Sequence, residues 1–205
     1  MAIDRPGPGE ELNAGEEVPA RAATSVILLR DSRRGPEVLL VQRNPASRFM
    51  GGAWVFPGGA VRDGDTDPRA TGVRELEEEA GIALHPAHEL VPFSRWITPA
   101  QVKIRFDTWF FVARAPDSAE AAPDGEECVD ARWLRPGGAL DEFRADRLLL
   151  VFPTIKHLEQ LAHYGSVEDA LASARSRDVQ PVQPRVLVEG DEARVVMPGE
   201  PGYDA

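Results

Sequence analysis

The sequence has a single cysteine, Cys128, which excludes an internal disulfide bond. It also lacks long hydrophobic runs, because stretches such as Leu148–Phe152 are far shorter than the ~20 apolar residues of a membrane-spanning helix. Residues 1–17 contain no apolar stretch of the kind that a secretory signal requires. From these absences we expect a protein of a reducing, cytoplasmic compartment that has no membrane partner.

Basic residues are scarce relative to acidic ones. The chain has 23 Lys and Arg against 34 Asp and Glu, which gives a formal net charge of −11. Such a chain repels polyphosphate backbones, which argues against binding to long nucleic acids or anionic surfaces. A local cationic pocket for a small phosphorylated molecule is still compatible with this charge. The content of 42% hydrophobic residues is that of a globular chain and not of a disordered one.

The length of 205 residues predicts one domain with extensions. Residues 1–20 are rich in Pro, Gly and Glu, which favours a flexible, solvated tail. We assign residues 21–165 to the main domain. Residues 166–205 form a C-terminal extension of a helix and a hairpin, which either caps the substrate pocket or makes a homodimer contact.

The order of secondary structure predicts a layered α/β fold. Residues 22–30 and 37–43 are β-rich runs around a turn-like linker and are expected to pair. Asp67-Pro68 is a typical helix start and Gly81 a typical helix stop, so a helix is predicted through Ala80. The other predicted elements are short strand 53–56, strands 104–115 and 126–134, helices 153–165 and 166–174, and hairpin 185–196. This order implies a mixed sheet with helices packed on it.

Three carboxylates of the predicted helix fall on one side of it. At about 100° per residue, Glu75, Glu78 and Glu79 share an arc of about 100°, beside the apolar face that contains Leu76. Clustered like charges near a helix C-terminus repel one another and are disfavoured by the helix dipole. A hard divalent cation offsets that repulsion, and Mg²⁺ binds oxygen ligands together with substrate phosphates.

A solvated acidic face is the alternative, since charge runs usually lie on the surface. Two features favour the metal site instead: the acids flank the apolar stripe and do not oppose it, and the helix follows a Gly58-Gly59 loop. Arg74 lies about 100° from Glu75, so it could orient a carboxylate from the side.

The segment from Gly58-Gly59 through RELEEEAGI at 74–82 resembles the Nudix box, whose common form is G-x5-E-x7-R-E-U-x-E-E-x-G-U with U apolar. The resemblance extends from about Arg21 to Trp133 in the order of strands. The second half of the box matches at every specified position, namely Arg74, Glu75, Leu76, Glu78, Glu79, Gly81 and Ile82.

The first half of the box departs from the common form. Counting back from Arg74 places the first Glu at Thr66 and the box Gly at Ala60, so the loop is one residue longer. Asp65 could replace the missing Glu, or it could serve as an Asx-type turn residue.

The resemblance implies an α/β/α sandwich with a mixed sheet. It also implies hydrolysis of a pyrophosphate bond in a nucleoside diphosphate linked to another moiety, with Mg²⁺ or Mn²⁺ as cofactor. Residues 49–59 and 96–116 resemble bacterial relatives of the peroxisomal coenzyme A diphosphatases, so coenzyme A or its esters is the leading substrate. ADP-ribose, dinucleotides and other free nucleotides are alternatives, and so is a non-catalytic nucleotide sensor, although sensors usually lose box carboxylates.

The resemblance also implies the roles of individual residues. Metal ligation falls to Glu75, Glu78 and Glu79, and to Gly59 through its carbonyl group. Glu127 matches the family pattern E-x5-W before Trp133 and is a ligand, the general base or a solvated acid at a strand edge. The expected catalytic set is Glu78, Glu127 and Arg74.

Substrate-binding candidates come from cations and aromatic side chains. Arg43, Arg48 and Lys103 are candidates for phosphate contacts. Phe49, Trp54, Trp96 and Trp109 are candidates for stacking on a base, with a place in the core as the alternative for each.

Overall fold

The computed structural model describes residues 11–13, 15, 17–65, 67–85, 87–117, 119–189 and 192–204. A mixed sheet is formed by strands β1 (Arg21–Ser32), β2 (Gly35–Arg43), β3 (Trp54–Val55), β4 (Gly58–Ala60), β5 (Val91–Ile97), β6 (Phe106–Arg114), β7 (Cys128–Leu134) and β8 (Pro181–Val182). The helices are α1 (Pro68–Ala80), α2 (Pro136–Arg144), α3 (Phe152–Leu161) and α4 (Val167–Arg175). Strands β9 (Arg185–Glu189) and β10 (Glu192–Val196) form a separate antiparallel hairpin.

Strand β1 is the centre of the sheet. It pairs antiparallel with β2, which confirms the predicted pairing of residues 22–30 and 37–43, and parallel with β6. Strand β4 also pairs with β1, and Thr24 lies opposite Gly59 in that ladder. The Gly58-Gly59 segment is therefore attached to the most buried strand of the fold.

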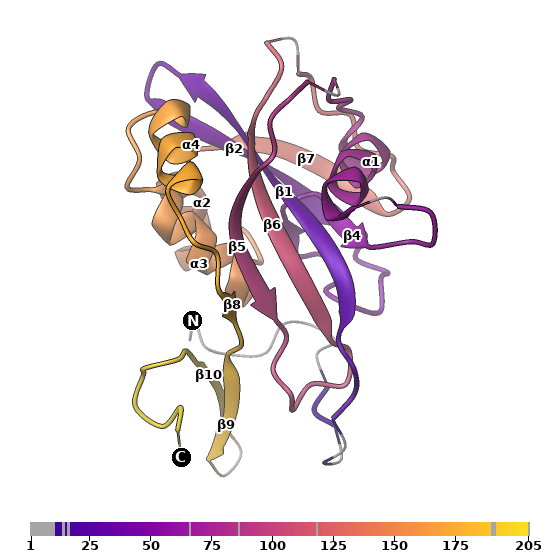
Figure 1. Cartoon of the computed structure of the whole chain (residues 1–205), viewed down its shortest axis with the longest axis vertical. Helices are drawn as coiled ribbons and strands as arrows, with labels where there is room; N and C mark the ends of the chain where they lie inside the picture. The colour runs from indigo at the N-terminus through magenta and orange to yellow at the C-terminus, as the bar shows by residue number, and fades with distance from the viewer. Residues whose placement is uncertain are drawn as a thin grey trace.

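Two hydrophobic clusters cover the two faces of the sheet. Alternate residues of β1 belong to different clusters: Ile27 and Leu29 face α2, α3 and α4, while Val26 and Leu28 face α1. Figure 1 shows α1 on one side of the sheet and the other three helices on the opposite side. This arrangement confirms the α/β/α sandwich with a mixed sheet.

Helix α1 begins and ends where its sequence predicts. The Asp67 carboxylate accepts hydrogen bonds from the backbone N–H groups of Arg69 at 2.6 Å and Ala70 at 3.1 Å, and such a cap stabilises a helix by about 1 kcal/mol. Gly81 ends the helix with φ of 66°, and its N–H donates to the Glu77 carbonyl. Gly72 lets the helix approach β1 closely, because a Cβ there would lie 2.9 Å from the Thr24 methyl group.

The prediction omitted strands β4, β5 and β8 and helix α2. Pro92 interrupts the pattern of β5, and the pairing register with β6 shifts between Pro92 and Ser94. Helix α2 contains Gly137-Gly138, which disfavours helix, and Arg135 makes no side-chain cap. Tertiary packing forms these elements, so local sequence gave a weak signal for them.

The described N-terminal residues contact the segment between β5 and β6. Leu12 forms a β-bridge with Val102, and the buried Arg105 binds Glu17 at 2.6 Å. In the C-terminal part of the chain, the Ser166 hydroxyl caps α4 by accepting a hydrogen bond from the Asp169 N–H. The turn at residues 190–191 of the predicted hairpin, like residues 1–10 of the tail, lies outside the described residues. Within the described part, no helix has the length and hydrophobicity needed to cross a membrane.

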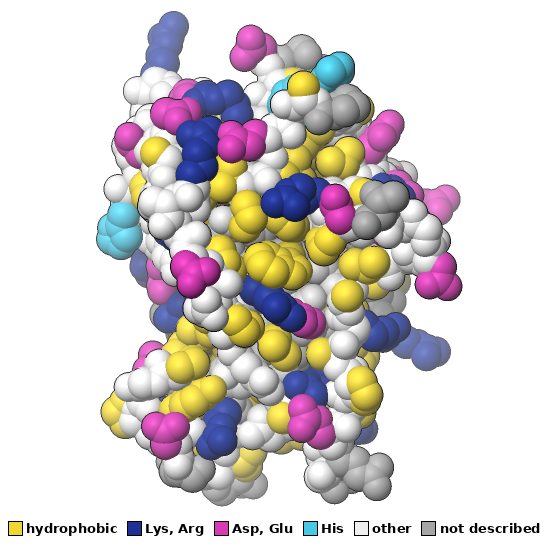
Figure 2. All heavy atoms as spheres, in the orientation of Figure 1, with side chains coloured by type: hydrophobic (Ala, Val, Ile, Leu, Met, Phe, Trp, Pro, Cys, Tyr) yellow, Lys and Arg dark blue, Asp and Glu magenta, His cyan; other side chains and the backbone are white. Residues whose placement is uncertain are grey.

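One predicted stacking residue, Trp109, belongs to the α1 side of the sheet. It stacks on Phe111, with ring centroids 6.0 Å apart, and Arg95 lies 5.4 Å from its ring centroid. Figure 2 shows hydrophobic side chains along the middle of this view, over the sheet between α4 and α1, with charged side chains around them. Trp109 is partly buried and packs against the hydrophobic cluster on the α1 side of the sheet.

Helix α3 brings a histidine into the core. His157 is 1% exposed; its Nδ1 lies 2.6 Å from the Pro153 carbonyl oxygen and its Nε2 lies 2.6 Å from Ser94 Oγ. Since a carbonyl only accepts, Nδ1 donates and Nε2 accepts from the Ser94 hydroxyl. The neighbouring rings are those of Phe56, Phe93, Trp96 and Phe110. Burial lowers the pKa of His157 to about 3 from an ordinary value of 6.5.

This pKa predicts an acid-sensitive core. Between the two values the unfolded chain binds a proton that the folded chain does not bind, so stability should fall as the pH is lowered from 6.5 towards 3. Urea unfolding should show a smaller loss over that interval for His157→Gln than for the unchanged chain. His163→Gln, at an exposed position, is the control and should follow the unchanged chain. Equal pH slopes for all three proteins would contradict a neutral, buried His157.

Candidate active site

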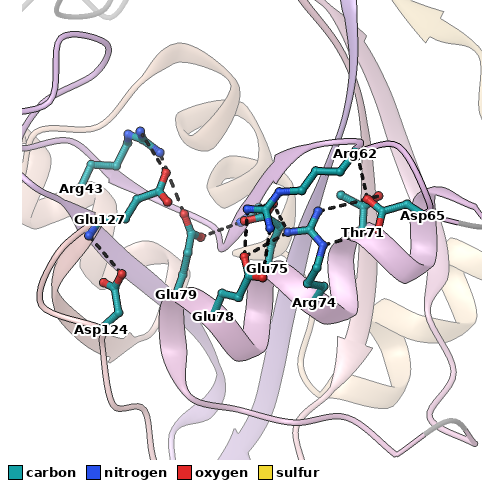
Figure 3. Close-up of polar contacts among 11 residues, drawn as sticks. Arg43, Arg62, Asp65, Thr71, Arg74, Glu75, Glu78, Glu79, Asp124 and Glu127 are labelled. Carbon is teal, nitrogen blue, oxygen red and sulfur yellow. Dashed lines mark hydrogen bonds and ion pairs between the residues drawn. The ribbon is translucent and has the colours of Figure 1, made fainter.

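The carboxylates predicted from α1 lie together at the helix face next to β4 (Figure 3). The side chains of Glu75 and Glu79 are only 5% and 2% exposed, whereas that of Glu78 is 45% exposed. The three carboxylates that share the predicted arc therefore differ in how deeply they are buried. Two carboxylates lie against the sheet and the third lies at the surface.

The backbone of β4 holds the two buried carboxylates. The Gly58 N–H donates to Glu79 Oε2 at 2.8 Å. A Cβ on Gly59 would lie 2.5 Å from the Glu75 carboxyl carbon, so only glycine at this position leaves room for the carboxylate. The two glycines therefore bring main-chain atoms within reach of the acids, as a carbonyl ligand at Gly59 would require.

Arg74 orients the acids from the side, at the angle that the helical geometry predicts. Its Nη1 donates to Glu75 Oε1 at 2.7 Å and to Glu78 Oε2 at 3.0 Å. Its Nη2 donates to Asp65 Oδ2 at 3.1 Å. One guanidinium thus links the loop before the helix to two of the three carboxylates.

Asp65 holds the loop onto the helix. Its carboxylate accepts from the Arg62 N–H at 2.9 Å, the Thr71 hydroxyl at 2.7 Å and Arg74. Arg74 above all, with these other two hydrogen bonds, keeps the pKa of Asp65 well below its usual range. This geometry favours a structural role over metal ligation by Asp65. Thr66, the position of the missing box Glu, lies outside the described residues.

Arg62 is a site residue that sequence reasoning missed. Its guanidinium binds the Glu78 carboxylate in a bidentate manner, at 3.1 and 3.0 Å (Figure 3). The chain position of Arg62, in a loop before the helix, gave no signal for this contact. As the side chains stand, no three His, Cys, Asp or Glu groups among the described residues converge as a ready cation site. Glu78 faces Arg62 and Arg74 instead.

Glu79 is nevertheless a carboxylate without a full set of partners. Its Oε1 is buried and has no hydrogen-bond partner among the described residues. Burial raises the pKa of Glu79 to about 8 despite the hydrogen bond from Gly58, and the nearby Glu75 charge raises it further. An unsatisfied buried oxygen is costly, and oxygen-only donors suit a hard divalent cation. The residues present therefore fit Mg²⁺ or Mn²⁺.

Arg43 and Glu127 stand beside this cluster. Arg43 Nη1 lies 4.0 Å from Glu79 Oε1, and its Nη2 lies 3.7 Å from Glu127 Oε1. A register shift between Gln42 and Arg43, where β2 pairs with β7, turns the chain at this point. The Asp124 carboxylate accepts the N–H groups of residues 126–128 and orders the turn that carries Glu127. Asp124 was also missed, because only the folded turn reveals its role.

A cavity of about 340 Å³ adjoins the cluster. Arg43, Gly58, Gly59 and Glu127 line one part of it, so the structure brings these predicted residues together. Of the aromatic candidates, Phe49 and Trp96 line the cavity.

The four other substrate-binding candidates, Arg48, Trp54, Lys103 and Trp109, do not line this cavity. Trp54 is 3% exposed in the core, with the Arg132 guanidinium 4.6 Å from its ring centroid. Lys103 pairs with Glu11 at 2.6 Å, and Arg48 is exposed on a loop. Residue type suggested these candidates, but the fold does not bring their side chains to the cavity beside the carboxylates.

Comparison with known protein families identifies the family of this chain. A family model described as the NUDIX domain matches residues 19–151, which include the carboxylate cluster and Glu127. The chain belongs to the NUDIX domain family. The hairpin β9–β10 lies beyond the part of the chain that the NUDIX match covers.

Curated NUDIX relatives are distant. A putative nudix hydrolase 7 of Caenorhabditis elegans is 27% identical, over 69% of this chain and 60% of that protein. The human acyl-coenzyme A diphosphatase NUDT19 is 27% identical, over 54% of this chain and 31% of that protein. A putative 8-oxo-dGTP diphosphatase 3 of Mycobacterium tuberculosis is 32% identical, over 59% of this chain and 55% of that protein. The match thus spans less than two thirds of each relative's length.

Solved NUDIX structures share the fold. A NUDIX hydrolase from Alicyclobacillus acidocaldarius superposes with a TM-score of 0.70 at 24% identity, over 76% of this chain and 96% of that chain. The NUDIX domain of Shewanella oneidensis NrtR, solved with ADP ribose, superposes with a TM-score of 0.55 at 19% identity, over 72% and 90%. At these identities the likeness concerns architecture.

Because Gly59 lies close to the Glu75 carboxylate, adding a methyl group at position 59 should disturb cation binding. Gly59→Ala should displace the Glu75 carboxylate and weaken Mn²⁺ binding by about tenfold or more, measured by electron paramagnetic resonance titration. Gly137→Ala is the matched control, because a Cβ there meets nothing within 4 Å, and it should bind Mn²⁺ normally. Normal Mn²⁺ affinity in a folded Gly59→Ala protein would rule out a role for this contact in cation binding.

Proposed function

We propose that this NUDIX domain is a metal-dependent diphosphohydrolase that cleaves the pyrophosphate bond of a nucleoside diphosphate linked to another moiety. The observation that carries the proposal is the buried Glu79 Oε1, which has no hydrogen-bond partner among the described residues. Glu79 accepts a hydrogen bond from Gly58, and Gly58 and Gly59 line the cavity. A protein keeps buried acids such as Glu75 and Glu79, despite their cost, where a cation and its anionic substrate compensate them.

Glu75, Glu78 and Glu79 would hold Mg²⁺ or Mn²⁺ together with the Gly59 carbonyl. The bound cation supplies charge neutralisation at the phosphates and lowers the pKa of a water molecule. For Glu78 to take part, its carboxylate must leave Arg62, whose side chain is 56% exposed and free to move into solvent. Arg74 keeps Glu75 oriented through the 2.7 Å hydrogen bond and is a positioning residue.

Arg43 and Glu127 would act on the substrate side. Arg43 lines the cavity and presents a guanidinium, which suits bidentate contact with a phosphate group. Glu127 lies next to it with a half-exposed carboxylate, which can accept the proton of an attacking water as general base. Phosphoryl chemistry of this kind depends mainly on positioning and on charge stabilisation.

Coenzyme A or one of its esters is the substrate that we favour. The likeness to a protein named acyl-coenzyme A diphosphatase supports it, as does the combination of a cationic and an apolar part in one cavity. ADP-ribose is the second candidate, because the NrtR domain of the same fold was solved with that compound. The same observation supports a nucleotide sensor, but the intact carboxylate set favours the enzyme.

A substrate panel tests the proposal. Coenzyme A, its esters, ADP-ribose, dinucleotides and NAD(H) would be incubated with Mg²⁺ or Mn²⁺ in ¹⁸O-labelled water, and product masses recorded. Cleavage should place ¹⁸O on one of the two phosphates and should stop when EDTA removes the metal. Saturable binding of a nucleotide without cleavage of any compound would instead identify a sensor.

A glutamate pair tests the proton transfer. Glu127→Gln should lower kcat by roughly a hundredfold or more, because the amide cannot accept the proton of the attacking water. Glu126→Gln is the matched neighbour, since hydrogen bonds to Glu126 involve its backbone, and it should retain kcat. Circular dichroism should show both variants folded. A Glu127→Gln enzyme with unchanged turnover would remove Glu127 from the mechanism.

A further inference from the structure

The cavity beside the carboxylates is lined for the most part by uncharged side chains among the described residues. Arg21, Arg43 and Glu127 are the charged residues among those that line it. Its remaining wall includes Trp96, Val102 and Phe152, whose side chains are apolar. A ligand that reaches both the charged and the apolar residues must therefore combine an anionic group with an uncharged apolar group.

The C-terminal hairpin completes this apolar part. Val186 of β9 and Val195 of β10 are directly opposite each other in the ladder, and both line the cavity. They are only 5% and 8% exposed, although the hairpin is a separate two-stranded sheet. Further along the same strand, Val188 is 57% exposed. The hairpin thus directs one pair of valines into the cavity.

The attachment of the hairpin keeps this wall in place. Strand β8 pairs with β5 so that Val182 lies opposite Trp96, and the chain enters β9 directly after residues 183–184. The Tyr203 hydroxyl donates to the Gln183 carbonyl at 2.8 Å. The valines therefore have a defined position relative to Trp96, an aromatic wall residue of the cavity.

We propose that the β9–β10 hairpin is a specificity element that encloses an uncharged apolar group of the diphosphate substrate. This inference rests on the proposed function for the anionic end and adds what the other end recognises. Because Val186 and Val195 present only methyl groups, aliphatic groups gain by burial against them, whereas a terminal carboxylate loses hydration and receives no hydrogen bond from these two side chains. The occupant is thus an aliphatic chain of the substrate itself.

Thioesters of increasing acyl chain length test whether the cavity binds an aliphatic chain. We would compare kcat/KM for coenzyme A and for its acetyl, butyryl, hexanoyl and octanoyl thioesters. Each buried methylene should raise kcat/KM about fourfold until the cavity is filled. Adipoyl-coenzyme A has the carbon chain of the hexanoyl ester with a terminal carboxylate, and it should be cleaved at least about tenfold less efficiently than that ester.

Substitutions in the hairpin test where the chain binds. Val195→Phe fills the cavity and should lower the ratio of kcat/KM for octanoyl-coenzyme A over coenzyme A by about tenfold or more. Val186→Thr keeps the shape but adds a hydroxyl, and it should flatten the dependence on chain length. Val188→Phe, on the exposed part of β9, is the matched control and should keep the ratio of the unchanged chain.

Binding to a Glu78→Gln protein provides a readout without turnover. Calorimetric titration should show octanoyl-coenzyme A binding more tightly than coenzyme A, and Val195→Phe in that background should remove the difference. If no panel compound is cleaved but this hairpin-dependent difference remains, the hydrolase proposal fails and the specificity element stands.

Other outcomes overturn the inference alone. Cleavage with no dependence on chain length, or with equal ratios in Val195→Phe and Val188→Phe, would leave a hydrolase whose hairpin does not select substrates. Light scattering that shows Val195→Phe dissociating a dimer would assign the valines to a contact between two copies. Absence of both cleavage and binding for all these compounds would reject the two proposals together.

Discussion

The structure depends on keeping two carboxylates out of water beside the main chain of β4. Burial of an ion costs several kcal/mol, even after relaxation, unless other charges and hydrogen bonds compensate it. For Glu75 the compensation is Arg74, and for Glu79 it is the Gly58 N–H with Arg43 at a longer distance. The compensation of Glu79 is incomplete, because its Oε1 has no hydrogen-bond partner among the described residues. A cation at that point would stabilise the folded chain as well as bind substrate.

Contacts elsewhere in α1 hold the helix in place and offset the free energy cost of burying the two carboxylates. Its first turn is capped by Asp67, and Gly72 allows it to lie close against β1. Asp65, held by Thr71 and Arg74, ties the preceding loop to the same helix. The acids at the C-terminal end of α1 therefore keep their positions through the attachment of the whole helix, despite the repulsion between like charges.

Sequence alone predicted what depends on local spacing. The helical period placed Glu75, Glu78 and Glu79 together, and Asp67 and Gly81 marked the ends of their helix. The sequence did not predict the contact between Arg62 and Glu78, because the path of a loop follows from tertiary packing. Trp54 and Lys103 were chosen for residue type and lie elsewhere, because only the fold determines which arginine or aromatic side chain reaches a cavity. The roles predicted for the metal ligands and for Glu127 stay predictions, and so do the predicted domain boundaries.

In the proposed site, the residues assigned to chemistry and those assigned to substrate selection come from different parts of the chain. The carboxylates, Arg43 and Glu127 lie within the NUDIX match at residues 19–151, whereas Val186 and Val195 come from beyond it. The two parts meet because β8 adds to the free edge of β5 and thereby carries the following hairpin to the cavity. A substitution in the hairpin changes cavity shape without touching Glu75 or Glu79. Substrate preference can therefore change while the charge balance that the catalytic end requires is preserved.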